Sequence, residues 1–405
     1  MQSDVSTTMS FRINFKTREA DIRKLELISQ TDGYLQILRM NADWAALLES
    51  RARLAEAVSS IGIEGTVVSL DQAKAITVGE KDIVIGERER REFVGYYESL
   101  EYIKNHLTDS LTIGLLLKVH EMVTRGDSDA CPGKIRDDRR AVKSRGKIIY
   151  TAPPPAQLNI LLREFVEWFN RTANNKDFSP VIAAAICHFW FVWIHPFCDG
   201  NGRVGRLLTT FLLLKKKSEG IRYFALSDYY NKNKDSYYDA LETTNKCIPN
   251  IPSMNFQDDL SPWVAYFVDS YLVQMKDLKE VTNRIFQLNI RVEHLRKAGL
   301  ITDTHNKVLS FLSSRERASY AELQIYLKVT KARVNQVLKP LREAHILVQE
   351  KIGPLIWFKL GSPEVETDET VLAKPVKKRL NRKEANQSKV KIRAIKGQKV
   401  LPIFE

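Results

Sequence analysis

The twelve residues from His195 to Arg206, HPFCDGNGRVGR, bring together features that could do chemistry on a phosphate group. Pro196 disfavours helical geometry at the residue before it, so the apolar helix that leads into this segment must end at His195. Gly200 and Gly202 allow a tight backbone turn, and the apolar run that follows begins a new helix. Such a turn presents free N–H groups and the positive end of a helix dipole, so it predicts an anion-binding site.

The polar side chains of this segment complement the anion site. Arg203 and Arg206 are three positions apart, which places them on one face of the first helical turn. Asp199 offers a hard oxygen ligand of the kind that Mg²⁺ prefers, and Mg²⁺ normally arrives with phosphates. His195 could accept a proton near neutrality, because the unperturbed pKa of histidine is about 6.5. Any one feature could be a helix end, a loop or solvated charge, but together they predict a phosphate-transfer site.

The segment resembles the signature of the Fic family, HPFx(D/E)GNGRxxR, and matches it at every specified position. The resemblance extends upstream to Pro132-Gly133 and Arg136, and downstream to the stretch LSDYYNKNKDSYYDALETTN, so that it covers about residues 50–275. It implies a helical Fic fold that transfers AMP from ATP to a Ser, Thr or Tyr hydroxyl of a target protein, a reaction called AMPylation. Self-modification is expected as well.

The resemblance also implies roles for individual residues. His195 would be the general base, and Asp199 would hold Mg²⁺ between the α- and β-phosphates. The turn amides and Asn201 would stabilise charge on the α-phosphate, and the two arginines would hold the outer phosphates. The flap, Val142 to Thr151, would pair edgewise with the target's backbone. The predicted ATP-binding residues are Gly200, Asn201, Gly202, Arg203, Val204, Gly205, Arg206, Tyr237, Tyr238 and Asn245. The two tyrosines and Asn245 match the nucleoside pocket more loosely, and tyrosines at helical spacing are as readily core residues.

A second element lies before the signature. The run from Ser60 to Gly65, SIGIEG, resembles the family's inhibitory motif (S/T)xxxE(G/N). This resemblance implies that Glu64 pairs with Arg206, takes the place of the γ-phosphate and thereby inhibits the enzyme. Taken alone, the same run would be an ordinary exposed glutamate followed by a helix-ending glycine. Gly62 within it weakens a helix by about 0.5–1 kcal/mol.

Composition limits the class of protein. The chain has 405 residues, 44% of them hydrophobic and 27% charged, which excludes wholesale disorder. Its longest apolar run, Val181 to Ile194, is too short for a bilayer span of about 20 residues. We expect no membrane segment and no secretory signal. The four cysteines follow no paired or metal-like spacing, which favours a reducing compartment and a cytoplasmic protein.

The net charge of +13 is concentrated in one segment. Between Leu372 and Val400, eleven Lys and Arg residues accompany a single acid, Glu384, for a net +10. The rest of the chain therefore carries only +3. The basic composition belongs to the C-terminal tail and says little about the main domain.

Hydrophobic periodicity predicts the elements that position the site. The first 300 residues read as a mostly α structure with one small β-hairpin over Ile135–Thr151. We divide them into an N-terminal helical region, 1–70, with the inhibitory motif at 60–65, and a Fic catalytic domain, 71–285. The expected helices are Ala20–Arg39 with a break near Thr31-Asp32-Gly33, Trp44–Val58, Glu87–His106, Leu111–Thr124, Pro155–Asn170, Pro180–Ile194, Gly202–Lys217, Ser236–Thr244 and Leu260–Ala298.

After residue 300 the pattern changes to three short helices and two strands, which resembles a winged helix-turn-helix over 300–361. The helices are expected at Thr304–Leu312, Tyr320–Leu327 and Lys331–Ala344, the last kinked or shortened by Pro340, and the strands at Ile346–Glu350 and Leu355–Leu360. Residues 362–405 read as a charged, flexible tail.

Other functions stay open. Fic relatives can move UMP, phosphocholine or phosphate, or remove AMP, although the intact Gly200-Asn201-Gly202 favours ATP as the AMP donor. A DNA-binding regulator with a nucleotide-sensing Fic domain is the second alternative. The resemblance also leaves a homodimer open, because relatives with this inhibitory element commonly self-associate. The candidate phosphate- and base-contacting residues are Lys328, Lys331, Arg333, Asn335, Gln336, Lys339 and Arg342. His188 and Cys198 are interpreted as structural residues.

Overall fold

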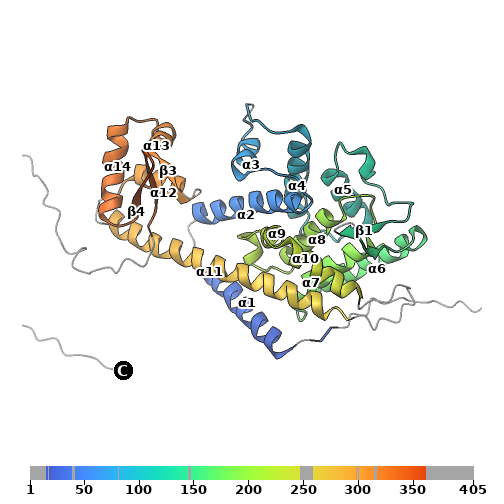
Figure 1. The fold of residues 1–405 in the computed structure, drawn as a ribbon. Coiled ribbons are helices and arrows are strands. Elements are labelled where there is room, and N and C mark those ends of the chain that lie inside the picture. Colours follow the sequence, from blue (N-terminus) through green and yellow to red (C-terminus); the bar gives the residue numbers. More distant parts are fainter. Residues whose placement is uncertain are drawn as a thin grey trace, which may run out of the picture. The chain divides into compact units, whose positions relative to one another are not determined.

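The computed structural model describes residues 15–16, 18–38, 42–80, 82–144, 147–246, 259–297, 299, 301–313 and 317–361. Figure 1 shows these residues as a mostly helical chain with two small antiparallel sheets, which confirms the predicted fold class. The predicted tail, 362–405, lies outside the described residues. Among the helices that are described, none is both long enough and apolar enough to cross a membrane.

Two consecutive helices form the centre of the main hydrophobic cluster. Helix α7 (Pro180–Ile194) is apolar on almost every side and is buried accordingly. It begins where Ser179 accepts a hydrogen bond from the backbone N–H of Ile182 and proline occupies the first helical position. Helix α8 (Asn201–Lys215) packs directly on α7. The turn between these two helices contains the signature, so a buried and closely packed helix pair holds both of its ends.

Helices from both sides of the sequence surround this pair. Contacts with α8 come from α4, α5 and α6, while α7 also packs on α6 and α11. Their bounds are α4 (Glu87–Asn105), α5 (Ile113–Val123), α6 (Pro155–Asn174) and α11 (Ser261–Lys297). The smaller elements are α3 (Leu70–Thr77), α9 (Leu226–Lys232), α10 (Lys234–Lys246) and the 3₁₀ turns η1 (Ser128–Ala130) and η2 (Gly220–Arg222). Helices α3 and α9 have only eight and seven residues, too few to give a clear periodic signal.

The two N-terminal helices pack on later parts of the chain. Helix α1 (Glu19–Ile37) lies against α11, and α2 (Ala42–Ile63) lies against α4 and α9. The predicted break in α1 is wrong, since the helix is continuous through residues 31–33. Thr31 donates its hydroxyl to the carbonyl of Leu27, and the Asp32 carboxylate accepts hydrogen bonds from the backbone N–H groups of residues 219 and 220. These contacts offset the low helix propensity of the segment.

The flap lies where the sequence predicts it, over Val142 to Thr151, although the segment before it is not part of the hairpin. Strands β1 (Ala141–Ser144) and β2 (Lys147–Thr151) pair antiparallel with an irregularity after Val142, and residues 145–146 at its tip are not described. Residues 135–140 are not strand, because side-chain contacts from Arg136 hold that segment instead. Strand β2 is fastened where the Tyr150 hydroxyl donates to the Trp193 carbonyl of α7 at 2.7 Å.

The last described elements form a second hydrophobic cluster. They are α12 (Asp303–Ser313), β3 (Ala318–Ser319), α13 (Tyr320–Leu327), α14 (Lys331–Glu343), β4 (Leu347–Ile352) and β5 (Leu355–Leu360), with sheet order β3-β5-β4. Ser319 and Thr330 cap α13 and α14 with side-chain hydrogen bonds. Pro340 lies inside α14, which continues to Glu343, so it barely shortens the helix. The order of elements suits the winged helix-turn-helix interpretation, with the two-residue β3 as an addition.

Candidate active site

The described residues enclose a cavity of about 410 Å³ at the start of α8, within the usual size range of small-molecule sites. Its walls come from α7, α8, α10, the flap and the end of α2. The lining residues are Glu64, Val142, Tyr150, Phe189, Val192, Trp193, His195, Asp199, Gly200, Asn201, Gly202, Arg206, Tyr237, Tyr238, Leu241 and Asn245. Residues predicted from three separate sequence segments therefore share one cavity.

His195 lies at the end of α7 and lines this cavity with a defined tautomer. Its Nδ1 atom is 3.1 Å from the carbonyl oxygen of Val192. A carbonyl can only accept, so we assign the proton to Nδ1, and Nε2 keeps a free lone pair. Burial lowers the pKa of His195 to about 4, against the weaker opposing effect of the Val192 carbonyl. At neutral pH the imidazole is therefore uncharged and able to accept a proton.

The backbone of His195 is left-handed, with φ 50° and ψ 58°, which costs a residue other than glycine about 1–3 kcal/mol. The buried Arg136 holds it there. Its Nε donates to the His195 carbonyl at 2.7 Å, its Nη2 donates to the Pro153 carbonyl at 2.6 Å, and its backbone N–H donates to Pro196 at 2.9 Å. Arg136 thus joins the turn that contains the signature to the segment just before α6, a role that its place in the family-like pattern did not reveal.

The turn before α8 is shaped for an anion. Gly200 has φ +77°, and a Cβ atom on it would lie only 2.9 Å from Thr124, so both conformation and space require glycine. The first N–H groups of α8 have no partner within the helix, because Val204 is the first residue whose N–H bonds back to Gly200. The side chain of Asn201 instead bonds both backbone groups of Phe197, at 2.9 Å each. It fixes the turn, and only its backbone N–H remains for an anion.

Arg206 is buried, and its partners come from the end of α2. Its Nη2 is 2.8 Å from Glu64 Oε1, and its Nε donates to the Ser60 hydroxyl at 2.8 Å. Burial alone would lower the pKa of Arg206, but Glu64, Tyr237 and Tyr96 together raise it, so the guanidinium stays charged. Glu64 Oε1 would be 2.6 Å from a Cβ on Gly202, which places this carboxylate at the N-terminus of α8. The predicted ion pair is present, with Glu64 one residue beyond the helix.

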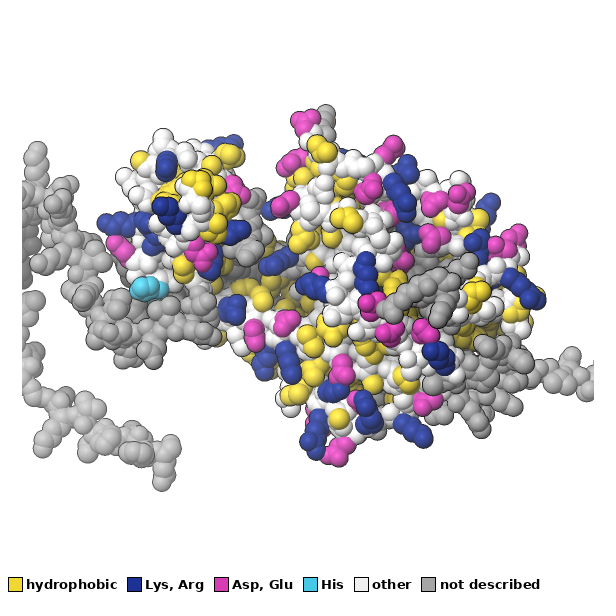
Figure 2. All heavy atoms as spheres, in the orientation of Figure 1, with side chains coloured by type: hydrophobic (Ala, Val, Ile, Leu, Met, Phe, Trp, Pro, Cys, Tyr) yellow, Lys and Arg dark blue, Asp and Glu magenta, His cyan; other side chains and the backbone are white. Residues whose placement is uncertain are grey.

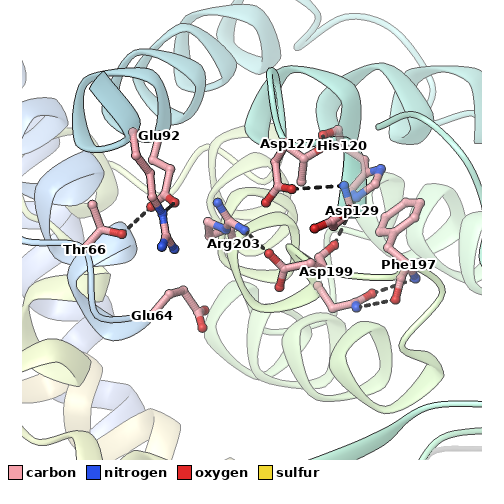
Figure 3. Close-up of polar contacts among 12 residues, drawn as sticks. Glu64, Thr66, Glu92, His120, Asp127, Asp129, Phe197, Asp199 and Arg203 are labelled. Carbon is pink, nitrogen blue, oxygen red and sulfur yellow. Dashed lines mark hydrogen bonds and ion pairs between the residues drawn. The ribbon is translucent and has the colours of Figure 1, made fainter. Parts of the chain in front are cut away.

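Asp199 and Arg203 pair with each other in Figure 3, with Arg203 Nη2 2.6 Å from Asp199 Oδ2. The Asp199 side chain is 60% exposed and lines the cavity. The described residues contain no cluster of three or more His, Cys, Asp or Glu side chains that could hold a metal. A single exposed carboxylate fits Mg²⁺ that arrives with phosphates, since this ion often uses one or two carboxylates and keeps its other ligands from water and phosphate.

Three predicted ATP contacts lie away from the cavity wall. Arg203 is buried against Asp199, Val204 is fully buried, and a Cβ on Gly205 would meet Val192 and Phe191 of α7. The small residue at position 205 serves the close packing of α7 on α8. The positions of Val204 and Gly205 give no support to their prediction as nucleotide contacts.

The two tyrosines of α10 both line the cavity, as the nucleoside-pocket interpretation predicts, and Tyr237 is also a core residue. Tyr237 lines the cavity yet is buried, with its hydroxyl 3.1 Å from His188 Nε2, and burial raises its pKa to about 12. Tyr238 and Asn245 line the same wall. His188 is fully buried and stacks on Trp263 at 4.9 Å between ring centroids, in keeping with its interpretation as a structural residue. Burial lowers its pKa to about 3.

One residue at this site, His120, was not predicted from any motif. His120, on α5, is fully buried, and Figure 3 shows its ring beside that of Phe197. Its Nε2 is 3.0 Å from the Asp199 carbonyl, and its ring is parallel to that of Phe197 at 3.7 Å. Cys198, which follows Phe197, is half-buried, and burial together with a hydrogen bond between Cys198 and Cys131 raises the pKa of Cys198 to about 11. A protonated thiol is no nucleophile, in keeping with its structural interpretation.

Comparison with known proteins gives this geometry a context. Residues 110–213 match the Fic/DOC family. The chain is 30% identical over 226 residues to a protein named protein adenylyltransferase Fic from Aedes aegypti, covering 55% of this chain and 40% of that protein. The protein of the same name from Drosophila melanogaster is 26% identical over 275 residues, covering 65% of this chain and 51% of its own length. The chain thus spans about half or less of these relatives.

Solved structures show the same fold. A Fic family protein from Desulfovibrio desulfuricans G20 superposes with a TM-score of 0.58 at 20% identity, covering 86% of this chain and 98% of that one. A Fic-domain signalling protein from Bacteroides thetaiotaomicron gives a TM-score of 0.56 at 20% identity, over 65% of this chain and 97% of its own. Residues 110–213, which contain the signature, therefore match the Fic/DOC family, and the chain shares the fold of these two solved structures.

Proposed function

We propose that this chain is a protein adenylyltransferase that transfers AMP from ATP to a Ser, Thr or Tyr hydroxyl of a target protein. The observation that carries the proposal is the uncharged imidazole of His195, whose Nε2 is free and which shares a cavity with the N-terminus of α8 and Arg206. The Fic/DOC match and the adenylyltransferase names of the relatives support it. ATP is the donor and a protein is the acceptor.

The geometry supports an in-line transfer. Nε2 of His195 takes the proton of the target hydroxyl while its oxygen forms a bond to the α-phosphorus. The bond from that phosphorus to the bridging oxygen of the β-phosphate breaks, and pyrophosphate leaves. The N–H groups at the start of α8 stabilise the charge on the α-phosphate oxygens. Mg²⁺, with Asp199 as a ligand, supplies further neutralisation of the phosphates when bound.

The flap offers a binding site for the acceptor, the target chain that receives AMP. Val142 and Tyr150 line the cavity from β1 and β2, and Tyr150 fastens β2 to α7 through Trp193. An extended segment that paired with this hairpin would place a hydroxyl near His195. We propose that target chains, and segments of the protein itself, bind in this way.

We further propose that Glu64 holds the enzyme inactive. It pairs with the buried Arg206 and lies against Gly202, where the outer phosphates of ATP would bind. Polar contacts along α2 keep it there. Glu56 accepts hydrogen bonds from the backbone N–H of Ser227 and from the Tyr96 hydroxyl, and the Gly62 carbonyl accepts one from Lys234.

The full-length Glu64→Gly variant tests the proposed reaction with ATP labelled at either the α- or the γ-phosphate. We expect transfer of α-label to protein, a mass increase of one AMP on the modified peptide, and no transfer by Glu64→Gly/His195→Ala. Transfer of γ-label alone would instead show phosphorylation. The same variant with UTP in place of ATP tests the donor, and AMP release from a modified target tests the reverse reaction.

A second function is favoured by the surface of α14. Lys331, Arg333 and Lys339 are exposed, and the nearby Arg342 bonds the amide oxygens of Gln349 and Asn335 instead of a carboxylate. Within this helix only Glu343 pairs with a cation, Lys339 at 3.8 Å. Figure 2 shows Lys and Arg side chains on the visible surface of the elements α12 to α14. We propose that this helix contacts DNA, with Lys328 on phosphate and Asn335 and Gln336 at the bases.

A gel-shift titration over salt tests DNA binding, with a chain ending at Gly361 as the control for the basic tail. If α14 binds phosphate, the shortened chain still retards DNA, and Arg333→Gln reduces the salt dependence. Loss of all retardation without the tail would contradict a role for α14. Homodimer formation and a cytoplasmic location remain proposals, tested by sedimentation and by fractionation of cells.

A further inference from the structure

We infer that His120 is a positioning residue that sets the catalytic turn through the main chain of Asp199. The inference rests on the proposed function and adds a residue to the site. His120 contacts neither the cavity nor the predicted phosphate position. It acts from the buried side of the turn by bonding the backbone carbonyl of Asp199, the residue whose carboxylate is the proposed Mg²⁺ ligand.

Both ring nitrogens of His120 are committed to backbone groups. Nδ1 is 3.0 Å from the N–H of Gly133, which can only donate, so Nδ1 accepts. The proton is therefore on Nε2, which donates to the carbonyl of Asp199 at 3.0 Å. Because the imidazole is completely buried, water cannot replace either partner. The ring connects the loop at residue 133 with the turn at residue 199.

The surrounding packing makes this connection rigid. The ring of His120 lies parallel to that of Phe197, with 3.7 Å between centroids and 5° between planes. Four residues later, at the C-terminal cap of α5, Thr124 packs where a side chain on Gly200 would be. Asn201 closes the turn from the other side through two hydrogen bonds to Phe197. His120 therefore holds in place the turn that carries the proposed metal ligand and the first N–H groups of α8.

Two substitutions separate this role from general stability. Glutamine places a side-chain amide N–H near the position of Nε2, so His120→Gln keeps the donor to Asp199 and loses the acceptor for Gly133. Asparagine places its oxygen near the position of Nδ1, so His120→Asn keeps the Gly133 contact and loses the one to Asp199. Both lose the ring stacking on Phe197. The pair therefore differs mainly in the hydrogen bond that the inference concerns.

The test uses full-length chains that also carry Glu64→Gly, with kcat/KM measured over a Mg²⁺ titration and hydrogen exchange measured for the peptide over 196–203. We expect His120→Asn to lower kcat/KM at limiting Mg²⁺ by about tenfold or more, the usual range for a lost outer partner of a metal ligand, and to raise exchange of the turn. His120→Gln should retain most of both properties at a similar melting temperature.

Equal losses in the two variants, in proportion to their melting temperatures, would overturn the positioning role and leave His120 a packing residue. Failure of the proposed function is distinguishable, because the Glu64→Gly parent would then transfer no AMP. The hydrogen-exchange comparison still tests the contact in that case, since it requires no activity.

Discussion

The ion pair between Glu64 and Arg206 gives the sharpest prediction about regulation. The guanidinium is almost fully buried, while the Glu64 side chain remains 35% exposed at the cavity. A charge-assisted hydrogen bond contributes about 1.5–3 kcal/mol, and we take about 1–2 kcal/mol because the exposed carboxylate is screened by solvent. ATP must overcome this contact to reach Arg206. Removing it should therefore raise the affinity for ATP–Mg²⁺ by about 5- to 30-fold.

Calorimetric titration with ATP–Mg²⁺ measures the effect directly. Glu64→Gln removes the charge but keeps the volume beside Gly202, and Glu64→Gly removes both, so the affinity should rise in that order. Glu92→Gln is the control, because that carboxylate bonds Thr66 just beyond α2 and has no contact with Arg206. Equal ATP affinity in the wild type and both Glu64 variants would refute the competition between carboxylate and phosphate.

Three further predictions concern the turn and the buried histidines. Because the pKa of His195 is about 4, kcat/KM of the Glu64→Gly chain should stay level through neutral pH and fall as the pH approaches 4, where protonation of the imidazole removes the base. A fall in kcat/KM centred near pH 6.5 would contradict this prediction. Gly200→Ala should lower the free energy of unfolding by about 1–3 kcal/mol. The control Gly79→Ala should lower it less, because Gly79 has a similar φ but open space around it. Equal losses in the two variants would show that the contact with Thr124 is unimportant. His188 has a pKa of about 3 in the folded chain and about 6.5 in the unfolded chain, so the unfolded chain binds more protons between these values. The free energy of unfolding should therefore fall as the pH drops from 6.5 to 4, by about 3 kcal/mol from this residue. Urea unfolding of His188→Gln, which keeps an amide near Tyr237, should show a correspondingly smaller drop.

Local patterns predicted the parts of the fold that depend on local sequence. The run from Val181 to Ile194 is apolar except for His188 and forms a helix that is almost entirely buried, and the His-Pro pair ends it where expected. The glycines after it start α8 within two residues of the prediction. The break expected in α1 failed because Asp32 finds partners near residue 220, far along the chain. A pattern within one segment carries no information about such partners.

The candidate site shows the same difference between features that depend on local sequence and contacts that join distant parts of the chain. Its base, anion turn and arginines lie within twelve residues, so their types and spacing could be interpreted together. The partner of Arg206 lies 142 residues away, and it was predicted only because the inhibitory motif resembles a known one. His120 contacts Asp199 across 79 residues and has no motif of its own, so nothing in the sequence distinguished it from a core histidine. The resemblance places Asn201 at the α-phosphate but does not indicate that its side chain bonds the backbone of Phe197.

A crystal structure of the Glu64→Gly chain with Mg²⁺ and a non-hydrolysable ATP analogue is the most direct test of the proposed chemistry. The α-phosphate should lie on the N–H groups at the start of α8, with Nε2 of His195 facing the side opposite the pyrophosphate and Asp199 on the metal. A triphosphate bound elsewhere, or an imidazole whose Nε2 points away from the α-phosphorus, would contradict the assignment of His195 as the base.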